Sequence, residues 1–468
     1  MEKETIETKK IIYKGKEKII PIKNPDSSKC EYYLIHKFRY CHFNKFNNSE
    51  FCIYHIPSNE SKEEFCICPY DSKHRILKSK FKQHLKTCNT LAYKNEEKNN
   101  PWYLENFNKP QINFLEYNIT NEELNKLYQS KYEDLEIEEY ESYINKIINV
   151  YEICKNLYED YVNKNNLIEF INKNFNKQEL KDKNIFYKIS GLNIDIENDL
   201  NHTEQLNHSL KHEIQKIAIS SLILNSNLIT INTKNCISIE FGAGKGGLSE
   251  QINNITNQNS INILLEREGL RYKLDKVSKH MIRYRTDIIN FNMNYLDDIN
   301  KLNIDEETKS ILLKDYYFIG IAKHICGCAF DLSLTCLFNY KNFDKIKGIC
   351  MATCCHHICK VELLNNLDFY YNTLKMNYKE IIYLFKATSW IFGKITNKEK
   401  KNKKEKEKLH EEFFIKNKIN KKYIGLIAKY IVDISRCMCL INKGFKVFYM
   451  KYCENKYTTE NNLILAIK

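Results

Sequence analysis

The 468-residue sequence has no long hydrophobic run. A helix that crosses a bilayer needs about 18 or more consecutive apolar residues. The best candidate, YYFIGIAKHICGCAF, is interrupted by Lys323 and His324. The stretch Met1–Lys10, MEKETIETKK, also lacks the apolar segment of a secretory signal. We therefore expect no membrane segment and an intracellular location, in the nucleus, the cytoplasm or both.

The absence of a secretory signal also decides how the cysteines are interpreted. Eighteen cysteines would indicate disulfides in a small secreted protein. Here we expect a reducing compartment instead. The cysteines are then metal ligands, core thiols or site residues.

Negative charge is the scarcer sign, because 72 Lys and Arg stand against 59 Asp and Glu, a net charge of +13. Such an excess indicates an acidic partner such as nucleic acid. Lys, Asn, Ile and Tyr are all frequent, however, and they share AT-rich codons, so mutational bias explains the lysines equally well. The hydrophobic content of 43% is enough for a buried core. The length allows two or three domains of roughly 150 residues each.

Composition divides the chain into three regions. Residues 30–88 contain six of the cysteines. Between about 120 and 225, apolar residues recur at three- and four-residue steps in Tyr140–Tyr161 and Leu210–Leu224, which predicts helices packed on a core. From residue 236 onward, seven short apolar runs alternate with helical spacers: CISIEF, INILLE, MIRYRTDI, YFIGIA, IKGICMA, KVFYMKY and NLILAI. This alternation predicts an α/β fold with a mostly parallel sheet.

A low-complexity charged insert, KITNKEKKNKKEKEKLH at 394–410, interrupts the last region. We interpret it as a solvated loop or a frayed helix. A contact with RNA is the alternative.

The first candidate metal site has four ligands in a short segment. They are Cys68, His74, His84 and Cys88. The stretch KSKFKQHLKTC reads as a helix, so His84 and Cys88 lie four residues apart on one face and can hold one ion together. Tetrahedral zinc contributes roughly 10 kcal/mol or more to the folding of such modules. The pattern predicts a zinc finger.

A second candidate set lies upstream with looser spacing. It comprises Cys30, Cys41, Cys52 and His55, with His42 and Cys66 as competing neighbours. Two small metal modules in tandem usually bind nucleic acid or protein. Together the two sets predict two zinc ions.

The segment ISIEFGAGKGG is a β-run that ends in glycines. Gly242, Gly244 and Gly246 fit G-x-G-x-G, and Gly247 also allows G-x-G-x-x-G, so a dinucleotide site and an S-adenosylmethionine site remain alternatives, as does a turn without ligand. Acidic residues favour the methyl donor. Glu240 precedes the glycines and can meet the cationic end of that cofactor; Glu266 ends the next run, where it can accept the ribose hydroxyls; Asp287 follows the third run, where it can contact the adenine amine.

With these features the chain resembles the eukaryotic tRNA 2′-O-methyltransferases that modify the fourth nucleotide of the acceptor stem. The resemblance runs through about residues 28–468. The matching segments are EFGAGKGGLS, Arg271-x-Lys273-x-Asp275, KHICGCAFDL, CCHHIC, TSW at Thr388–Trp390, TTENNLILA and KHEIQ at Lys211–Gln215, besides the two cysteine and histidine sets. It departs from the family at Ser435, at Gly247 and in the 394–410 insert.

The resemblance implies a domain order. A CCCH zinc module at 28–57 and a CHHC finger at 64–92 precede a helical linker region at 120–225 and a Rossmann-like class I methyltransferase domain at 205–468. It further implies S-adenosylmethionine as cofactor and tRNA as partner. Two other functions stay open: a non-catalytic zinc-finger RNA-binding protein, and a methyltransferase with a small-molecule or protein substrate.

Candidate catalytic residues follow the fourth and fifth runs, where open α/β sheets place their ligands. They are Lys323, His324, Cys354, Cys355, His356 and His357. Lys323 needs a lowered pKa to accept a proton, whereas a histidine does not. For the cluster MATCCHHICK we favour an acceptor-side or catalytic loop, because adjacent side chains at a strand end alternate in direction and rarely close around one ion. Structural packing and a third metal site are the alternatives.

Overall fold

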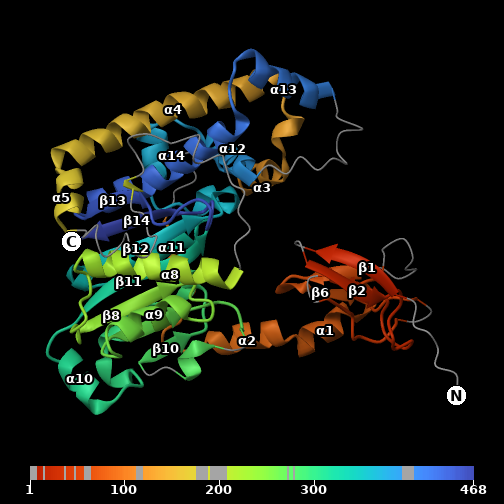
Figure 1. Ribbon diagram of the computed structural model, residues 1–468, viewed down its shortest axis with the longest axis horizontal. Helices are drawn as coiled ribbons and strands as arrows, with labels where there is room; N and C mark the ends of the chain where they lie inside the picture. The colour runs from red at the N-terminus through yellow and green to blue at the C-terminus, as the bar shows by residue number, and fades with distance from the viewer. Residues whose placement is uncertain are drawn as a thin grey trace. The chain divides into compact units, whose positions relative to one another are not determined.

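The computed structural model of the protein describes residues 8–13, 16–35, 38–46, 49–56, 65–111, 120–174, 188–189, 208–270, 273–277, 280–392 and 405–468. The chain divides into two compact units, Met1–Asn100 and Pro101–Lys468. Figure 1 shows both, and each is treated by itself below.

The first unit consists of small two-stranded sheets and two helices. Its elements are β1 (Thr8–Tyr13), β2 (Lys16–Pro21), β3 (Tyr33–Leu34), β4 (Arg39–Tyr40), β5 (Phe65–Cys68), β6 (Asp71–Leu77), α1 (Phe81–Thr87) and α2 (Asn89–Glu97). The strands pair antiparallel as β1 with β2, β3 with β4 and β5 with β6. Helix α1 is the helix predicted from KSKFKQHLKTC. Cysteines dominate the buried clusters of this unit.

An eight-stranded sheet organises the second unit, in the order β10-β9-β8-β11-β12-β14-β13-β7. Its strands are β7 (Lys188–Ile189), β8 (Cys236–Phe241), β9 (Ile261–Leu265), β10 (Met281–Tyr284), β11 (Tyr317–Cys326), β12 (Ile346–Cys354), β13 (Lys446–Lys451) and β14 (Asn462–Ile467). The five strands from β10 to β12 are parallel, and β14 runs antiparallel to both of its neighbours. All seven predicted runs form strands, and the predicted α/β fold with a mostly parallel sheet is confirmed.

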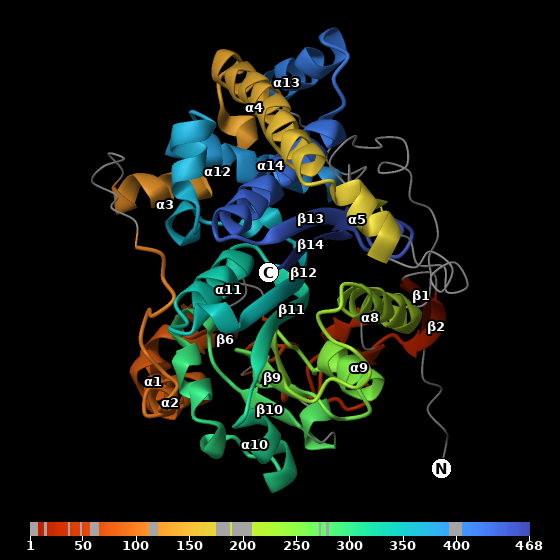
Figure 2. The ribbon, with the colours of Figure 1, turned by 90° about the vertical axis from the view of Figure 1, so that its left-hand side faces the viewer.

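Helices lie on both sides of this sheet, some packed on its strands and others on neighbouring helices (Figure 2). They are α3 (Asn121–Gln129), α4 (Ile137–Lys164), α5 (Leu167–Asn174), α8 (His208–Asn225), α9 (Gly247–Ile255), α10 (Glu306–Leu312), α11 (Ala329–Phe338), α12 (Tyr378–Ala387), α13 (Glu405–Lys416) and α14 (Lys421–Asn442). Figure 2 shows α8 and α9 on one face of the parallel strands and α11 on the other. Searching the described helices finds none with the length and apolarity that a bilayer crossing requires.

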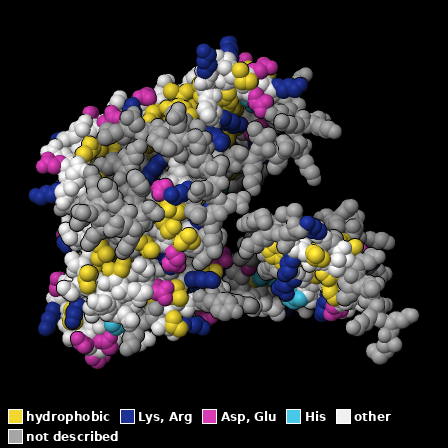
Figure 3. All heavy atoms as spheres, in the orientation of Figure 1, with side chains coloured by type: hydrophobic (Ala, Val, Ile, Leu, Met, Phe, Trp, Pro, Cys, Tyr) yellow, Lys and Arg dark blue, Asp and Glu magenta, His cyan; other side chains and the backbone are white. Residues whose placement is uncertain are grey.

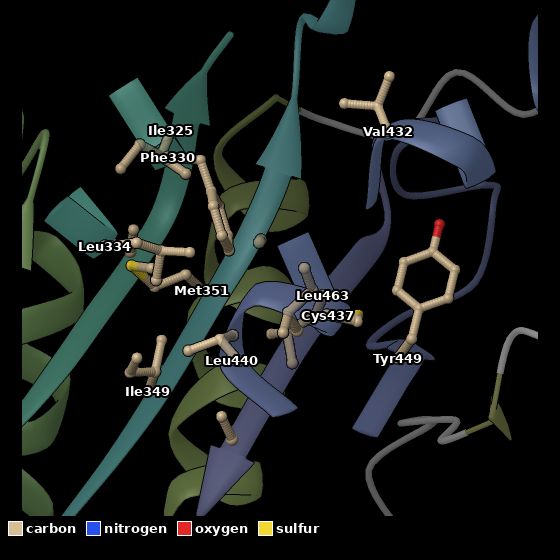
Figure 4. Close-up of a cluster of buried hydrophobic side chains, with 14 of the residues drawn as sticks. Ile325, Phe330, Leu334, Ile349, Met351, Val432, Cys437, Leu440, Tyr449 and Leu463 are labelled. Atoms are coloured by element: carbon tan, nitrogen blue, oxygen red, sulfur yellow. The ribbon is translucent and has the colours of Figure 1, made fainter. Parts of the chain in front are cut away.

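The core lies where the strands meet α11 and α14. In Figure 4, Phe330 of α11 and Leu440 of α14 lie in one cluster with Ile325, Met351 and Leu463 of the central strands. The strand residues in this cluster come from runs in which most side chains are buried, as expected for a sheet covered on both faces.

Helix α4 begins and ends close to the predicted periodic stretch. Its buried residues include Tyr140, Tyr151 and Tyr158 on one face. Near its end, Tyr158 Oη accepts the Tyr449 N–H at 2.6 Å and Tyr161 Oη accepts the Val447 N–H at 2.8 Å. These hydroxyls satisfy backbone donors on β13, close to the edge of the sheet. The helical segment therefore belongs to the second unit.

The charged insert lies only partly within the described residues, because 393–404 fall outside them. Its end forms the first turns of α13. There His410 is buried and stacks on Tyr140, with ring centroids 3.9 Å apart. The insert is therefore anchored at this end rather than solvated throughout.

Candidate active site and metal centres

The upstream set brings its four ligand atoms together. All of them, from Cys30, Cys41, Cys52 and His55, lie within 4.8 Å of one another. His55 Nδ1 is 3.3 Å from Cys52 Sγ and 3.5 Å from Cys30 Sγ. Three soft thiols and one imidazole form a donor set that suits zinc. The competing His42 is exposed and lies outside the set.

The downstream set converges in the same way. The ligand atoms of Cys68, His74, His84 and Cys88 lie within 4.8 Å of one another. Nε2 of His84 is buried and has no hydrogen-bond partner in the described structure, as expected for a nitrogen that binds a metal ion. His74 presents Nδ1 to Cys88 at 3.7 Å and Nε2 to Asp71 at 3.5 Å, so a carboxylate orients the ring from behind. Cys66 is not in the set.

The glycine turn joins β8 to α9 in left-handed backbone geometry. The φ angles are +63° at Gly242, +53° at Gly244 and +88° at Gly246. A Cβ at Gly246 would lie 2.6 Å from a methyl of Leu264, so packing requires glycine there. A Cβ at Gly244 would meet no protein atom within 4 Å, which leaves room for a ligand to approach the backbone. The turn thus has one packed glycine and one open glycine.

Three carboxyl groups stand at the ends of neighbouring parallel strands. Glu240 is buried, and its Oε2 accepts the Ser249 N–H at 3.0 Å and the Ser249 hydroxyl at 2.6 Å. Burial raises the pKa of Glu240 to about 7, against the opposing effect of the Ser249 hydrogen bonds. Glu266 accepts the Gly244 N–H at 2.8 Å, and Asp287 accepts the Ile289 N–H at 3.2 Å. A carboxylate has about four acceptor sites on its two oxygens, so these hydrogen bonds do not exhaust the capacity of each group to accept from a ligand hydroxyl or amine.

Arg283 forms hydrogen bonds that fix the glycine turn, a role that sequence reasoning missed. Its Nε donates to Asp275 at 2.8 Å and its Nη1 to the Gly244 carbonyl at 2.8 Å. Asp275 was noticed only as part of a motif with Arg271, and Arg271 lies outside the described residues. The motif therefore indicated Asp275, but it did not indicate that Arg283 is its partner.

Lys323 and His324 lie at the end of β11, beside the turn. The His324 carbonyl is 3.4 Å from the Cβ position of Gly242. Lys323 Nζ lies 2.9 Å from His212 Nδ1 and 3.5 Å from Gln215 Oε1, both on α8. Burial lowers the pKa of Lys323, and burial together with the charge of Lys323 lowers the pKa of His324 to about 4. His212 and Gln215 belong to KHEIQ, whose roles the sequence did not reveal.

His356 occupies a different environment, within the core. It is 1% exposed, and its Nε2 lies 2.7 Å from Asp433 Oδ1. Asp433 also accepts from Thr353 at 2.9 Å and from Arg436 at 3.2 Å. Burial opposes ionisation, yet the charges of His356 and Arg436 hold the pKa of Asp433 at about 2. This arrangement has the form of a buried structural network.

The remaining candidate catalytic residues, His357, Cys354 and Cys355, differ in their surroundings. His357 is exposed, whereas Cys354 and Cys355 lie with Cys326, at the end of β11. Cys326 Sγ is 3.3 Å from Cys354 Sγ. The six candidates therefore fall into three groups: the β11 pair, the buried histidine, and the strand-end residues around the thiols.

Comparison with known protein families gives two matches, and together they include most of these candidate residues. The family model described as "Methyltransferase TRM13" matches residues 214–467, and that of the "U11-48K-like CHHC zinc finger" matches 67–89. Both ranges contain candidate sites described above. The CCCH set lies outside both matches.

Relatives match over almost the whole chain. Proteins named "tRNA:m(4)X modification enzyme TRM13" from Vanderwaltozyma polyspora and Scheffersomyces stipitis are 27% and 28% identical, covering 95% and 92% of this chain and 99% and 98% of their own. The "tRNA:m(4)X modification enzyme TRM13 homolog" of Homo sapiens is 23% identical over 95% of each chain. No solved structure matches the chain at a significant level.

Proposed function

Because the chain belongs to the TRM13 methyltransferase family, whose model matches more than half of it, we propose that it methylates the ribose 2′-hydroxyl of nucleotide 4 in the acceptor stem of tRNA, with S-adenosylmethionine as donor. The names of the relatives support tRNA as the substrate. The observation that carries the proposal is the open glycine turn, with the buried carboxyl group of Glu240 on one side and the half-buried amine of Lys323 on the other.

The donor fits the edge formed by β8, β9 and β10. Gly244 leaves room for it, Glu240 faces its cationic end, and Glu266 and Asp287 supply acceptors for its ribose and adenine. When bound, the donor supplies an activated methyl group on a positively charged sulfur. The protein's contribution is to hold that group in line with the acceptor oxygen and to exclude water.

Lys323 is the residue we propose as proton acceptor. Burial lowers its pKa, so a larger fraction of its amine is neutral near physiological pH. His212 and Gln215 hold Nζ in place. The neutral amine would accept the hydroxyl proton as the oxygen forms its bond to the methyl carbon, while the methyl–sulfur bond breaks and its electron pair stays on the sulfur as a neutral thioether. His324, with a pKa of about 4, stays neutral near physiological pH.

The first unit is proposed to bind the tRNA through its two zinc modules. Around the CCCH set, the aromatic side chains of Tyr32, Phe43 and Tyr54 are between 42% and 46% exposed. Figure 3 shows hydrophobic side chains on the visible surface of this unit, with Lys and Arg beside them. Exposed rings next to cations are the combination that stacks on bases and attracts phosphates. A small acceptor molecule does not need such a surface.

An intracellular site of action follows from the tRNA substrate, in the nucleus, the cytoplasm or both.

The test is a methylation assay with labelled S-adenosylmethionine and total tRNA, followed by alkaline hydrolysis. A 2′-O-methyl group blocks cleavage on its 3′ side, so we expect label in dinucleotides, and primer extension at low nucleotide concentration should pause at nucleotide 4. The control variant is Glu240→Gln, which removes the carboxylate proposed to meet the cationic end of the donor. Label confined to mononucleotides would indicate base methylation, and no incorporation despite donor binding would indicate a non-catalytic RNA-binding protein.

A further inference from the structure

Three thiols converge at the carboxyl ends of two neighbouring strands of the second unit. Cys326 ends β11, Cys354 ends β12 and Cys355 follows it. Cys326 and Cys354 are paired in the register of the two strands, and their sulfurs are 3.3 Å apart. The sulfurs of all three lie within 4.8 Å of one another, the same criterion that both zinc-module sets meet.

The backbone at Cys355 explains how adjacent residues reach one point. In a regular strand, the side chains of neighbours point to opposite faces. Cys355 has a φ of +51°, in the left-handed region that non-glycine residues rarely adopt. This conformation breaks the alternation on which a catalytic-loop interpretation of MATCCHHICK rested. A backbone outlier of this kind persists only where the surrounding structure requires it.

The three thiols differ in exposure. Cys354 is buried, Cys355 is partly buried and Cys326 is exposed. In the two zinc-module sets, by contrast, every cysteine is buried. The group is therefore a half-open site with three ligands, and one side of it faces solvent.

We propose that Cys326, Cys354 and Cys355 bind a zinc ion through three thiolates, with water in the fourth position. Thiolates select zinc and other soft ions, and three protein ligands with one open position are a recurrent zinc geometry. A disulfide would use only two of the three sulfurs. The ion ties the loops that follow β11 and β12, and so fixes the strand end that carries Lys323 and His324.

The first test is the zinc content of the full-length chain, purified under reducing conditions and measured by plasma mass spectrometry. We expect Cys326→Ser and Cys355→Ser each to lose one zinc equivalent per chain relative to the unsubstituted protein. Cys439→Ala, at a buried cysteine of α14 outside all three sets, should lose none. Equal zinc content in all four proteins would overturn the proposal.

Cobalt substitution provides a second readout that is independent of stoichiometry. Replacing zinc by Co²⁺ should give sulfur-to-metal charge-transfer absorption that falls in Cys326→Ser and Cys355→Ser but not in Cys439→Ala. A peptide map without reductant that shows a Cys326–Cys354 disulfide, with no zinc difference, would instead assign a redox pair. Both measurements use neither tRNA nor methyl donor, so their failure is distinguishable from failure of the methylation assay. Far-UV circular dichroism checks that the variants fold.

Discussion

The two units of this protein differ in the residues that form their buried clusters. In the first, the buried clusters consist mainly of the candidate zinc ligands, such as Cys30, Cys41 and Cys52. In the second, one large cluster joins strand and helix residues, and buried polar side chains such as His356 and Asp433 have hydrogen-bond partners within it. A short segment cannot bury enough apolar surface, so we expect a metal ion to take the place of a core in the first unit. Stability of the first unit should then depend on ligands, and that of the second on packing.

The largest expected effect tests the metal side of the comparison. Cys52→Ser removes one of four ligands, and because zinc supplies roughly 10 kcal/mol or more to such modules, the CCCH module should unfold. Hydrogen exchange of residues 28–56 should become fast while exchange in the second unit stays unchanged. The control is His42→Ala, at an exposed histidine outside the set. If both variants exchange alike, the ligand assignment is wrong.

The next effect tests the packed side. His356→Ala leaves Asp433 without its nearest partner in the core, and we expect a loss of about 3–5 kcal/mol in the free energy of unfolding of the second unit. Urea denaturation followed by fluorescence measures it. His357→Ala, at the exposed neighbour, should change that free energy by less than about 0.5 kcal/mol. Equal effects of the two substitutions would contradict the buried network.

A third variant should separate catalysis from stability within the second unit. Lys323→Ala removes the proposed proton acceptor, and we expect turnover to fall by about 100-fold or more. The affinity for S-adenosylmethionine, measured by calorimetry, should persist. The matched variant is Lys216→Ala on α8, which removes a neighbouring lysine paired with Glu213. Near-normal methylation by Lys323→Ala would remove this residue from the mechanism.

The smallest effect concerns the pH dependence of donor binding. Burial raises the pKa of Glu240 to about 7, so the folded protein holds this proton more tightly than the unfolded chain, and its ionisation lowers stability as pH rises from about 4.5 to 7. A cationic donor favours the ionised form. Affinity should therefore rise about tenfold from pH 6 to pH 8.

Glu240→Gln should flatten this profile, and Glu250→Gln, further along α9, should leave it unchanged. Calorimetric titration at pH 6, 7 and 8 checks both. A pH profile that survives in Glu240→Gln would assign the proton to another group.

Sequence reasoning was most successful where the signal is local. The spacing of Cys68, His74, His84 and Cys88 fits within one hairpin and one helix, so short-range geometry already places the ligands near one another. The strands were found for a similar reason, since a strand buried on both faces is apolar along its length. Within the eight-stranded sheet, the strand that was not predicted is β7, which has only two residues and no such run.

The partners that define the site are remote in sequence. His356 meets Asp433 across 77 positions, and Lys323 meets His212 across 111. The sequence showed His356, Lys323 and His212 only as members of motifs with no stated contact, and it did not single out Asp433. The histidines of MATCCHHICK looked equivalent, yet folding buries one and exposes the other.

The sequence by itself determined the α/β fold, the two zinc-ligand spacings and the position of the glycine turn, because periodicity and short-range spacing encode them. Only the tertiary structure decided which side chains share a site, because strand register and helix packing set those distances. It placed Lys323 and His324 beside the glycine turn, His356 in the core and Cys326 with Cys354 and Cys355 at the carboxyl ends of two neighbouring strands. The left-handed backbone at Cys355 is the clearest case, since it reverses the alternation that the sequence predicted.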